Sequence, residues 1–213
     1  MPGKVNGRTT LRDAQVAETE RRIIAAATPL FAAHGYTATS LTEVARAAGV
    51  GARTVYVRFG TKAALFNRVV ETAIVGDTAP VALLDRDVAV PVRTAPTAAE
   101  RIAAAAAVNR GIMERTGPLF AAAREAEPAA PEVAALFARG REQTRAAQRE
   151  FWTRLRADRL LPPGADLDWL TDTAAVLCGA DTYLLVTRMY GWDLGTYQAW
   201  LETTLRNLAA VPA

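Results

Sequence analysis

The sequence predicts an all-α protein, and three observations support that fold class. Of the 213 residues, 51% are hydrophobic, Ala, Leu and Arg are abundant, and β-branched runs bounded by turns are few. Apolar residues recur at helical spacing along most of the chain. Two segments also have the S/T-x-x-E pattern of a capping box, in which paired side chains satisfy free amides at a helix start: Ser40 with Glu43, and Thr97 with Glu100.

The N-terminal segment is predicted to be an arm followed by one helix. Residues 1–16 mix Gly, Pro, Thr and Arg without periodicity, and we expect a flexible arm that either follows a phosphate backbone or stays unbound. A helix over 17–33 follows, with Pro29 inside it to bend the axis, and with its charged side chains, Arg22 among them, facing water. His34, the only histidine, is expected to be a solvated last-turn residue rather than a ligand or catalytic group.

Residues 40–62 have the pattern of a helix-turn-helix. A first short helix starts at the capping box and ends before Gly49, where a left-handed backbone conformation costs glycine little. A second helix is expected over 52–59, and Thr61 can cap a third helix over 62–74. In such a motif the second helix enters the major groove of DNA.

Charge is distributed unevenly along the chain. Residues 1–76 hold ten Lys and Arg against five Asp and Glu, a balance of +5, whereas residues 77–213 hold fifteen against seventeen, a balance of −2. A basic N-terminal part and a nearly neutral remainder suit a protein with one end facing a polyanion, although charge alone also fits a solvated basic surface.

Several classes of site and location are disfavoured by what the sequence contains. Cys178 is the only cysteine, which excludes an intramolecular disulfide and favours a reducing compartment. The first fifteen residues lack the apolar core of a secretory signal, and the most apolar later run is interrupted by Asp181. No metal-ligand spacing, phosphate loop or nucleophile elbow is present. We therefore expect a cytoplasmic protein without catalytic residues, metal or cofactor, and with no membrane partner.

The segment TSLTEVARAAGVGARTVYVRFGTKAALF, residues 39–66, resembles the DNA-binding signature of the TetR family of transcriptional regulators. The resemblance covers roughly residues 21–70. It implies a three-helix helix-turn-helix DNA-binding domain over 17–76 and a helical-bundle ligand-binding and dimerisation domain over 77–213. In the family, the last two helices pack against their copies in a homodimer. The matching residues are Thr42, Val44, Ala45, Ala48, Gly49, Val50, Thr54, Tyr56, Phe59, Lys62 and Leu65.

The predicted DNA contacts come from the place of the recognition helix and from the resemblance. Residues near the start of this helix are placed to read base edges, and Arg53 could bind guanine through two hydrogen bonds. Family positions that contact phosphate are matched by Thr42, Tyr56 and Lys62. A half-buried packing role for Tyr56, or a mobile surface charge at Arg53, stays an alternative. The full predicted set is Thr42, Ala52, Arg53, Thr54, Tyr56, Val57, Arg58 and Lys62.

Two residues depart from the family pattern in this region. Gly51 stands where a serine cap is usual, which weakens capping of the recognition helix. Ala64 stands where an acidic first-turn residue is common, which removes a favourable charge at the helix start.

The C-terminal part is expected to be a bundle of helices after an extended, proline-containing connection over 76–96. The Gly117-Pro118 pair is expected to break a helix, and the arginine-rich helix that starts at Pro131 is expected to have a solvated charged face. The helices are expected over 97–116, 118–126, 131–158, 167–190 and 194–209.

An effector pocket is the least defined prediction, because ordinary core packing is the stronger interpretation for each candidate residue. Polar contacts could come from Asn109, Arg110 or Asp181. The predicted lining is Arg110, Met113, Phe120, Phe137, Trp152, Trp169 and Tyr183.

The resemblance implies a homodimeric repressor that a small hydrophobic effector releases from a palindromic operator in double-stranded DNA. A ligand-independent activator or global regulator, an enzyme with a nucleic-acid-binding head, and an architectural DNA-binding protein remain as alternatives.

Overall fold

The computed structural model describes residues 7–78 and 83–210, and these residues form α-helices and short 3₁₀ turns without a strand. The all-α prediction is therefore confirmed. The elements are α1 (Gly7–Ala38), α2 (Leu41–Ala47), α3 (Ala52–Phe59), α4 (Lys62–Val75), η1 (Leu83–Asp85), η2 (Asp87–Ala89), α5 (Val90–Thr94), α6 (Ala98–Ala126), α7 (Pro131–Ala157), α8 (Leu167–Cys178), α9 (Ala180–Met189) and α10 (Leu194–Ala210). The connection expected over 76–96 thus contains short helical turns.

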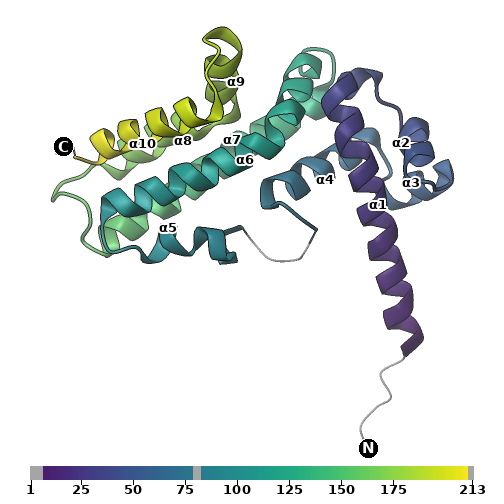
Figure 1. The fold of residues 1–213 in the computed structure, drawn as a ribbon, viewed down its shortest axis with the longest axis horizontal. Coiled ribbons are helices and arrows are strands. Elements are labelled where there is room, and N and C mark those ends of the chain that lie inside the picture. The colour runs from purple at the N-terminus through teal and green to yellow at the C-terminus, as the bar shows by residue number, and fades with distance from the viewer. Residues whose placement is uncertain (1–6, 79–82, 211–213) are drawn as a thin grey trace, which may run out of the picture.

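Two long helices, α6 and α7, run along the body of the molecule (Figure 1). Helices α1–α4 lie at one end, and α8 and α10 lie beside α6 and α7 at the other. Helix α6 contacts α1 and α4 at the first end and α5 and α10 at the second. It also contacts α9, whose Arg188 pairs with Glu125 near the C-terminus of α6. Helix α6 therefore packs against elements of both ends of the molecule.

The interior consists of two hydrophobic cores, one at each end of α6. The first core joins residues of α1–α4, such as Phe31 and Val55, to Leu119 near the C-terminus of α6 and Val133 of α7. The second core joins the N-terminal half of α6 to α7, α8 and α10, and Trp152 is fully buried in it. The helix-turn-helix end is therefore stabilised in part by helices of the C-terminal part.

Helix α1 begins earlier than the sequence predicts. It starts at Gly7, so residues 7–16 of the expected flexible arm are helical, while residues 1–6 lie outside the described residues. Residues 8–16 contain neither Gly nor Pro, which explains how the helix extends backward. At the other end Gly35 has φ 80° and ψ 170°, which interrupts the helical path where the sequence predicts an end.

The expected break at Gly117-Pro118 is wrong, because α6 continues through both residues. Proline removes one backbone hydrogen bond, but Gly117 and Leu119 on either side of it are buried against other helices, and this packing offsets the loss. Gly117 also gives room for an aromatic ring: a Cβ there would lie 2.8 Å from Cε1 of Tyr183.

The single helix expected over 167–190 is two helices, α8 and α9, separated by Gly179 in an extended conformation. Side chains from elsewhere satisfy the carbonyls that the break leaves free. Asn109 Nδ2 donates to the carbonyl of Cys178 at 3.0 Å, and Tyr197 Oη lies 3.3 Å from the carbonyl of Leu177. Because these partners come from α6 and α10, the local sequence pattern does not reveal the break.

The arginine-rich face of α7 is paired rather than only solvated. Arg145 and Asp172 of α8 form an ion pair at 2.6 Å, and Arg149 pairs with Asp168 one turn away. Arg141 binds Asp181 of α9 at 2.8 Å, so this carboxylate is already in an ion pair, and a contact between Asp181 and an effector stays a prediction. Exposed pairs of this kind contribute little each, but their repeat at four-residue spacing fixes the register of α7 against α8.

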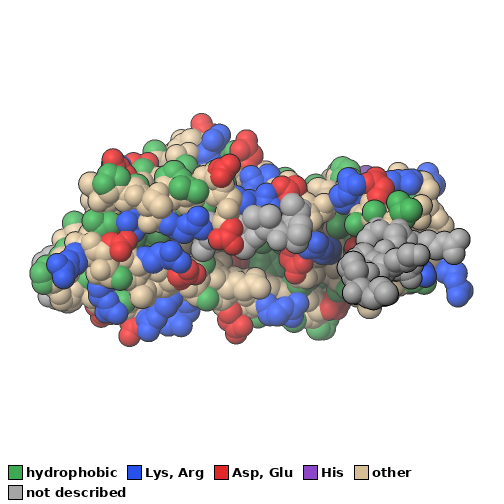
Figure 2. Space-filling model, turned by 90° about the horizontal axis from the view of Figure 1, so that it is seen from below, with side chains coloured by type: hydrophobic (Ala, Val, Ile, Leu, Met, Phe, Trp, Pro, Cys, Tyr) green, Lys and Arg blue, Asp and Glu red, His purple; other side chains and the backbone are tan. Residues whose placement is uncertain are grey.

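Charges of both signs lie on the surface of the C-terminal part. Figure 2 shows basic and acidic side chains interspersed along the C-terminal part of the face in view. Within residues 7–78 and 83–210, no helix is both long enough and apolar enough to cross a membrane.

Candidate nucleic-acid interface

The turn between α2 and α3 is held from α1. Gly49 has φ 64°, a conformation that side-chain-bearing residues rarely adopt. Arg22 donates from its guanidinium to the carbonyl of Ala48 at 2.7 Å, although the sequence predicts that it faces water. A Cβ on Gly49 would lie 3.1 Å from this guanidinium, so Gly49 serves both the backbone conformation and the approach of Arg22.

Caps fix where the short helices begin. Ser40 accepts a hydrogen bond from the amide of Glu43 at 3.1 Å, and Thr61 caps α4 by accepting from the amide of Ala64 at 3.0 Å. The carboxylate of Glu43 lies 3.5 Å from Nδ1 of the half-exposed His34, so it does not complete the expected capping box. Gly51 gives α3 no side-chain cap, as its sequence position predicts.

The recognition helix α3 is anchored by one face and open on the other. Val55 is fully buried in the first core, whereas Arg53 and Arg58 are exposed. Tyr56 and Val57 are 53% and 69% exposed, which is unusual for large side chains of this kind. An exposed tyrosine and valine between two arginines give hydroxyl, methyl and guanidinium groups on one surface, and these groups suit phosphates, thymine methyls and guanine edges.

The remaining predicted DNA contacts lie around this surface. Thr42 is exposed in the first turn of α2, while Ala52 and Thr54 are half-buried in the first turn of α3. Lys62 is already engaged: its ammonium donates to the carbonyls of Tyr36 and Thr37 at 3.0 and 3.2 Å. Lysine has three donors, so one remains, and a phosphate contact at Lys62 stays a prediction.

Tyr36 connects this end of the molecule to the C-terminal part, a role that the sequence does not reveal. Its ring lies 4.4 Å beneath the Lys62 ammonium, and its hydroxyl donates to Oε1 of Glu132 in α7 at 3.0 Å. Burial, and then the neighbouring Glu132 carboxylate, raise the pKa of Tyr36 above its ordinary value. A second connection comes from Arg115 of α6, which donates to the carbonyls of Ala73 and Ile74 at the end of α4.

The predicted effector lining is not brought together in one cavity. Met113 and Trp152 are buried in the second core, with Phe120 and Tyr183 packed against it and Arg110 half-buried nearby. The other two predicted residues lie elsewhere. Phe137 belongs to the first core and reaches the other five only through Phe120, whose ring centroid lies 6.3 Å from its own, and Trp169 is 60% exposed on α8.

The side chains of the described residues do not support metal binding or thiol chemistry. Among the described residues, no three His, Cys, Asp or Glu side chains converge as a metal site requires. Burial raises the pKa of the Cys178 thiol to about 12, which makes it a poor nucleophile at neutral pH.

The family model of bacterial regulatory proteins of the tetR family matches residues 23–69, from α1 into α4. This segment is a TetR-family helix-turn-helix domain. Members of this family are DNA-binding transcription factors rather than enzymes. The match therefore does not support the alternative of an enzyme with a nucleic-acid-binding head. No curated protein matches the chain.

Solved structures with similar folds extend the likeness to nearly the whole chain. A protein from Rhodococcus sp., described as a TetR-family transcriptional regulator, has a TM-score of 0.69 at 13% identity and covers 90% of this chain and 99% of its own. One from Mesorhizobium loti gives 0.63 at 20% identity, covering 91% and 96%. The TetR-family regulator PfmR of Thermus thermophilus gives 0.55 at 18% identity, covering 90% and 100%. At these identities the likeness concerns the fold.

Proposed function

We propose that this TetR-type regulator acts in the cytoplasm as a homodimeric repressor, bound to a palindromic operator and released by a small hydrophobic effector. The observation that carries the DNA-binding part is the division of α3 into a buried anchor, Val55, and an exposed face with Arg53, Tyr56 and Val57. A rigidly held helix with this face outward is the arrangement needed for entry into a major groove.

The dimer proposal is supported by large apolar side chains exposed on α8 and α9. Val176 and Met189 are 67% and 71% exposed, and Trp169 lies two turns before Val176 on the same helix. Leu185 and Tyr190 add to this exposed apolar surface. A second copy of the chain would cover such a surface, and two-fold symmetry would present two recognition helices to a palindrome.

The effector proposal is supported by buried polar atoms in the second core and beside it. Among the described residues, Trp152 Nε1, Thr171 Oγ1 and Arg110 Nε are buried and have no hydrogen-bond partner. A buried donor without a partner costs about 1–3 kcal/mol, so a ligand carrying a few polar atoms would be stabilised there. Binding would require α6, α7 and α8 to separate, and α6 would transmit that movement to α1 and α4.

The experiment that tests the DNA-binding proposal is a gel-shift titration with DNA from upstream of the protein's own gene. We expect a discrete complex that survives an excess of unrelated competitor DNA. Diffuse shifts that disappear with added salt would contradict operator recognition and favour an architectural role.

The effector part is tested on the purified full chain by native mass spectrometry, which detects any small molecule that stays bound. The candidate compound is then added to the discrete complex. Release of DNA supports a repressor that responds to ligand. An unchanged complex would instead favour the ligand-independent regulator.

A further inference from the structure

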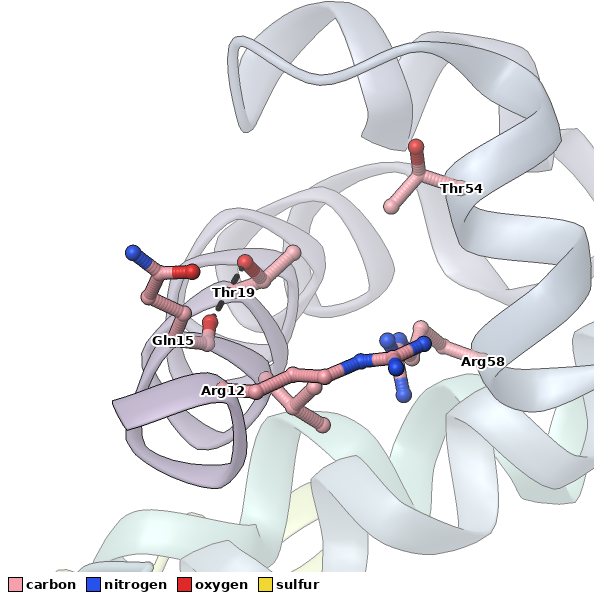
Figure 3. A pocket seen from close by; sticks show the side chains of 6 residues that line it. Arg12, Gln15, Thr19, Thr54 and Arg58 are labelled. Carbon is pink, nitrogen blue, oxygen red and sulfur yellow. Dashed lines mark hydrogen bonds between the residues drawn. The ribbon is translucent and has the colours of Figure 1, made fainter. Parts of the chain in front are cut away.

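The N-terminal extension of α1 and the recognition helix form a groove of about 250 Å³. Figure 3 shows Arg12 reaching from α1 toward Arg58 of α3, with the two guanidinium groups inside the same groove. Gln15 and Thr19 line it from α1, and Thr54 lines it from α3. The groove therefore joins the expected arm to the surface that reads DNA.

The charges in this groove are unbalanced. Its lining has two arginines and no carboxylate, and neither Arg12 nor Arg58 forms an ion pair within the described part of the chain. Two guanidinium groups that face each other repel, and an anion between them removes that repulsion. The planar guanidinium fork also matches phosphate oxygens with two parallel hydrogen bonds.

The polar neighbours suit a phosphodiester rather than a base. The Thr19 hydroxyl donates to the carbonyl of Gln15 at 2.8 Å, so its hydrogen is occupied. The donors that face the space between the two helices are therefore the guanidinium groups of Arg12 and Arg58, since Figure 3 shows the side-chain amide of Gln15 pointing away from them. Donors from both helices and no acidic acceptor in the lining describe a site for anionic oxygen.

We propose that this groove binds one backbone phosphate of each operator half-site, between Arg12 and Arg58. The proposal rests on the DNA-binding function above and adds residues of α1 to the interface. In Figure 1 the N-terminal half of α1 extends away from α8 and α9, which carry the surface assigned to the second copy. The phosphate therefore belongs to the outer edge of the half-site, away from the dyad.

The test uses Arg12→Ala in the full chain, with Arg21→Ala as the matched control. Arg21 lies nine residues further along α1, which is about two and a half turns, so it sits on the opposite face and pairs there with Glu18. Arg12→Ala should weaken operator binding about tenfold at low salt and lower the slope of log K against log salt by about 0.9 per half-site. Arg12→Lys keeps the charge and should retain most of that slope.

Ethylation interference on the operator identifies the phosphate itself. In the wild-type complex an ethylated phosphate at the outer edge of each half-site should block binding. Arg12→Ala and Arg58→Ala should each abolish interference at that same phosphate, whereas Arg21→Ala should leave it in place. Loss at two different phosphates, or no loss with Arg12→Ala, would overturn the proposal.

The outcomes also distinguish a failure of this proposal from a failure of the proposed DNA-binding function. If the wild-type chain forms no discrete operator complex, the DNA-binding function itself fails. If that complex forms but Arg12→Ala leaves affinity and salt slope unchanged, only the groove proposal fails. Inorganic phosphate added without DNA tests whether the groove binds a free anion instead. If phosphate stabilises the folded protein only when Arg12 is present, and Arg12→Ala binds DNA as the wild type does, the groove is a site for a free anion. That pair of results would overturn the proposal.

Discussion

Two regions of the molecule expose large side chains, and they differ in chemistry. On α3, Tyr56 and Val57 stand beside Arg53 and Arg58. On α8 and α9 the exposed large side chains are apolar or aromatic, and the aspartates of α8 are held by arginines of α7. The first surface therefore suits a charged, hydrogen-bonding partner, and the second suits a partner as apolar as itself.

The difference also concerns how each surface is supported. Helix α3 has eight residues and depends on Val55, the Gly49 turn and Arg22 to hold its position. The surface of α8 lies on a helix of twelve residues that packs against α7 in the second core and whose last carbonyl accepts a hydrogen bond from Asn109 of α6. If a movement of α6 shifted the supports of the short helix α3, the distance between the two recognition helices of the proposed dimer would change.

The largest expected effect comes from a charge on the apolar surface. Val176→Glu would place a carboxylate in the dimer interface twice by symmetry, and we expect dimer affinity to fall by at least about 100-fold, because unpaired buried charges cost several kcal/mol. Light scattering after size exclusion should then show monomers at micromolar concentration. Val88→Glu, at an exposed valine of η2, is the control. A dimeric Val176→Glu protein would place the interface elsewhere.

A smaller effect is expected on the DNA-reading surface, and it should separate base contacts from phosphate contacts. Arg53→Ala should lose about 1–3 kcal/mol of discrimination at one base pair per half-site, since a bidentate contact to guanine would be removed. Tyr56→Ala should weaken binding to all sequences alike. Binding-site selection with each variant measures this difference. Unchanged sequence preference in Arg53→Ala would remove Arg53 from the base-reading set.

The smallest effect tests the hydrogen bond that connects the helix-turn-helix end of the molecule to α7. Tyr36→Phe removes the hydrogen bond to Glu132 and should lower the free energy of unfolding by about 1 kcal/mol near neutral pH. The pKa of Tyr36 is raised in the folded state, so its contribution is complete below the unfolded pKa of about 10 and declines as pH rises above it. Wild type should therefore lose stability faster than Tyr36→Phe between about pH 10 and 11. Parallel denaturant midpoints across this range would exclude the connection.

The helix-turn-helix could be predicted from sequence because its determinants are local. The Ser40 cap, the left-handed Gly49 and the Thr61 cap each act within a few residues of the positions they control. The absence of a side-chain cap at Gly51 could also be predicted from the sequence, because glycine has no side chain that could accept the hydrogen bond. The DNA contacts assigned to these helices stay predictions, since they depend on a partner.

The features that the sequence did not reveal depend on residues far apart in the chain. Arg22 reaches a turn 26 residues away, and the break at Gly179 is stabilised by Asn109, 69 residues before Cys178. Pro118 stays inside α6 because the residues on either side of it pack against other helices, and a local sequence pattern does not predict such packing. The groove between α1 and α3 is a further example, because its lining residues come from two helices that are far apart in the chain.

Hydroxyl-radical oxidation with mass spectrometry reads both surfaces in one experiment, because tyrosine, tryptophan and methionine side chains react according to their exposure. We expect operator DNA to protect Tyr56 from oxidation and to leave the oxidation of Trp169 and Met189 unchanged. Dilution below the dimer affinity should increase oxidation of Trp169 and Met189 and leave Tyr56 unchanged in the absence of DNA. If the oxidation of Tyr56 does not change when DNA is added, the assignment of the α3 surface to DNA is contradicted. If the oxidation of Met189 does not change with protein concentration, the assignment of the α8 and α9 surface to a second copy is contradicted.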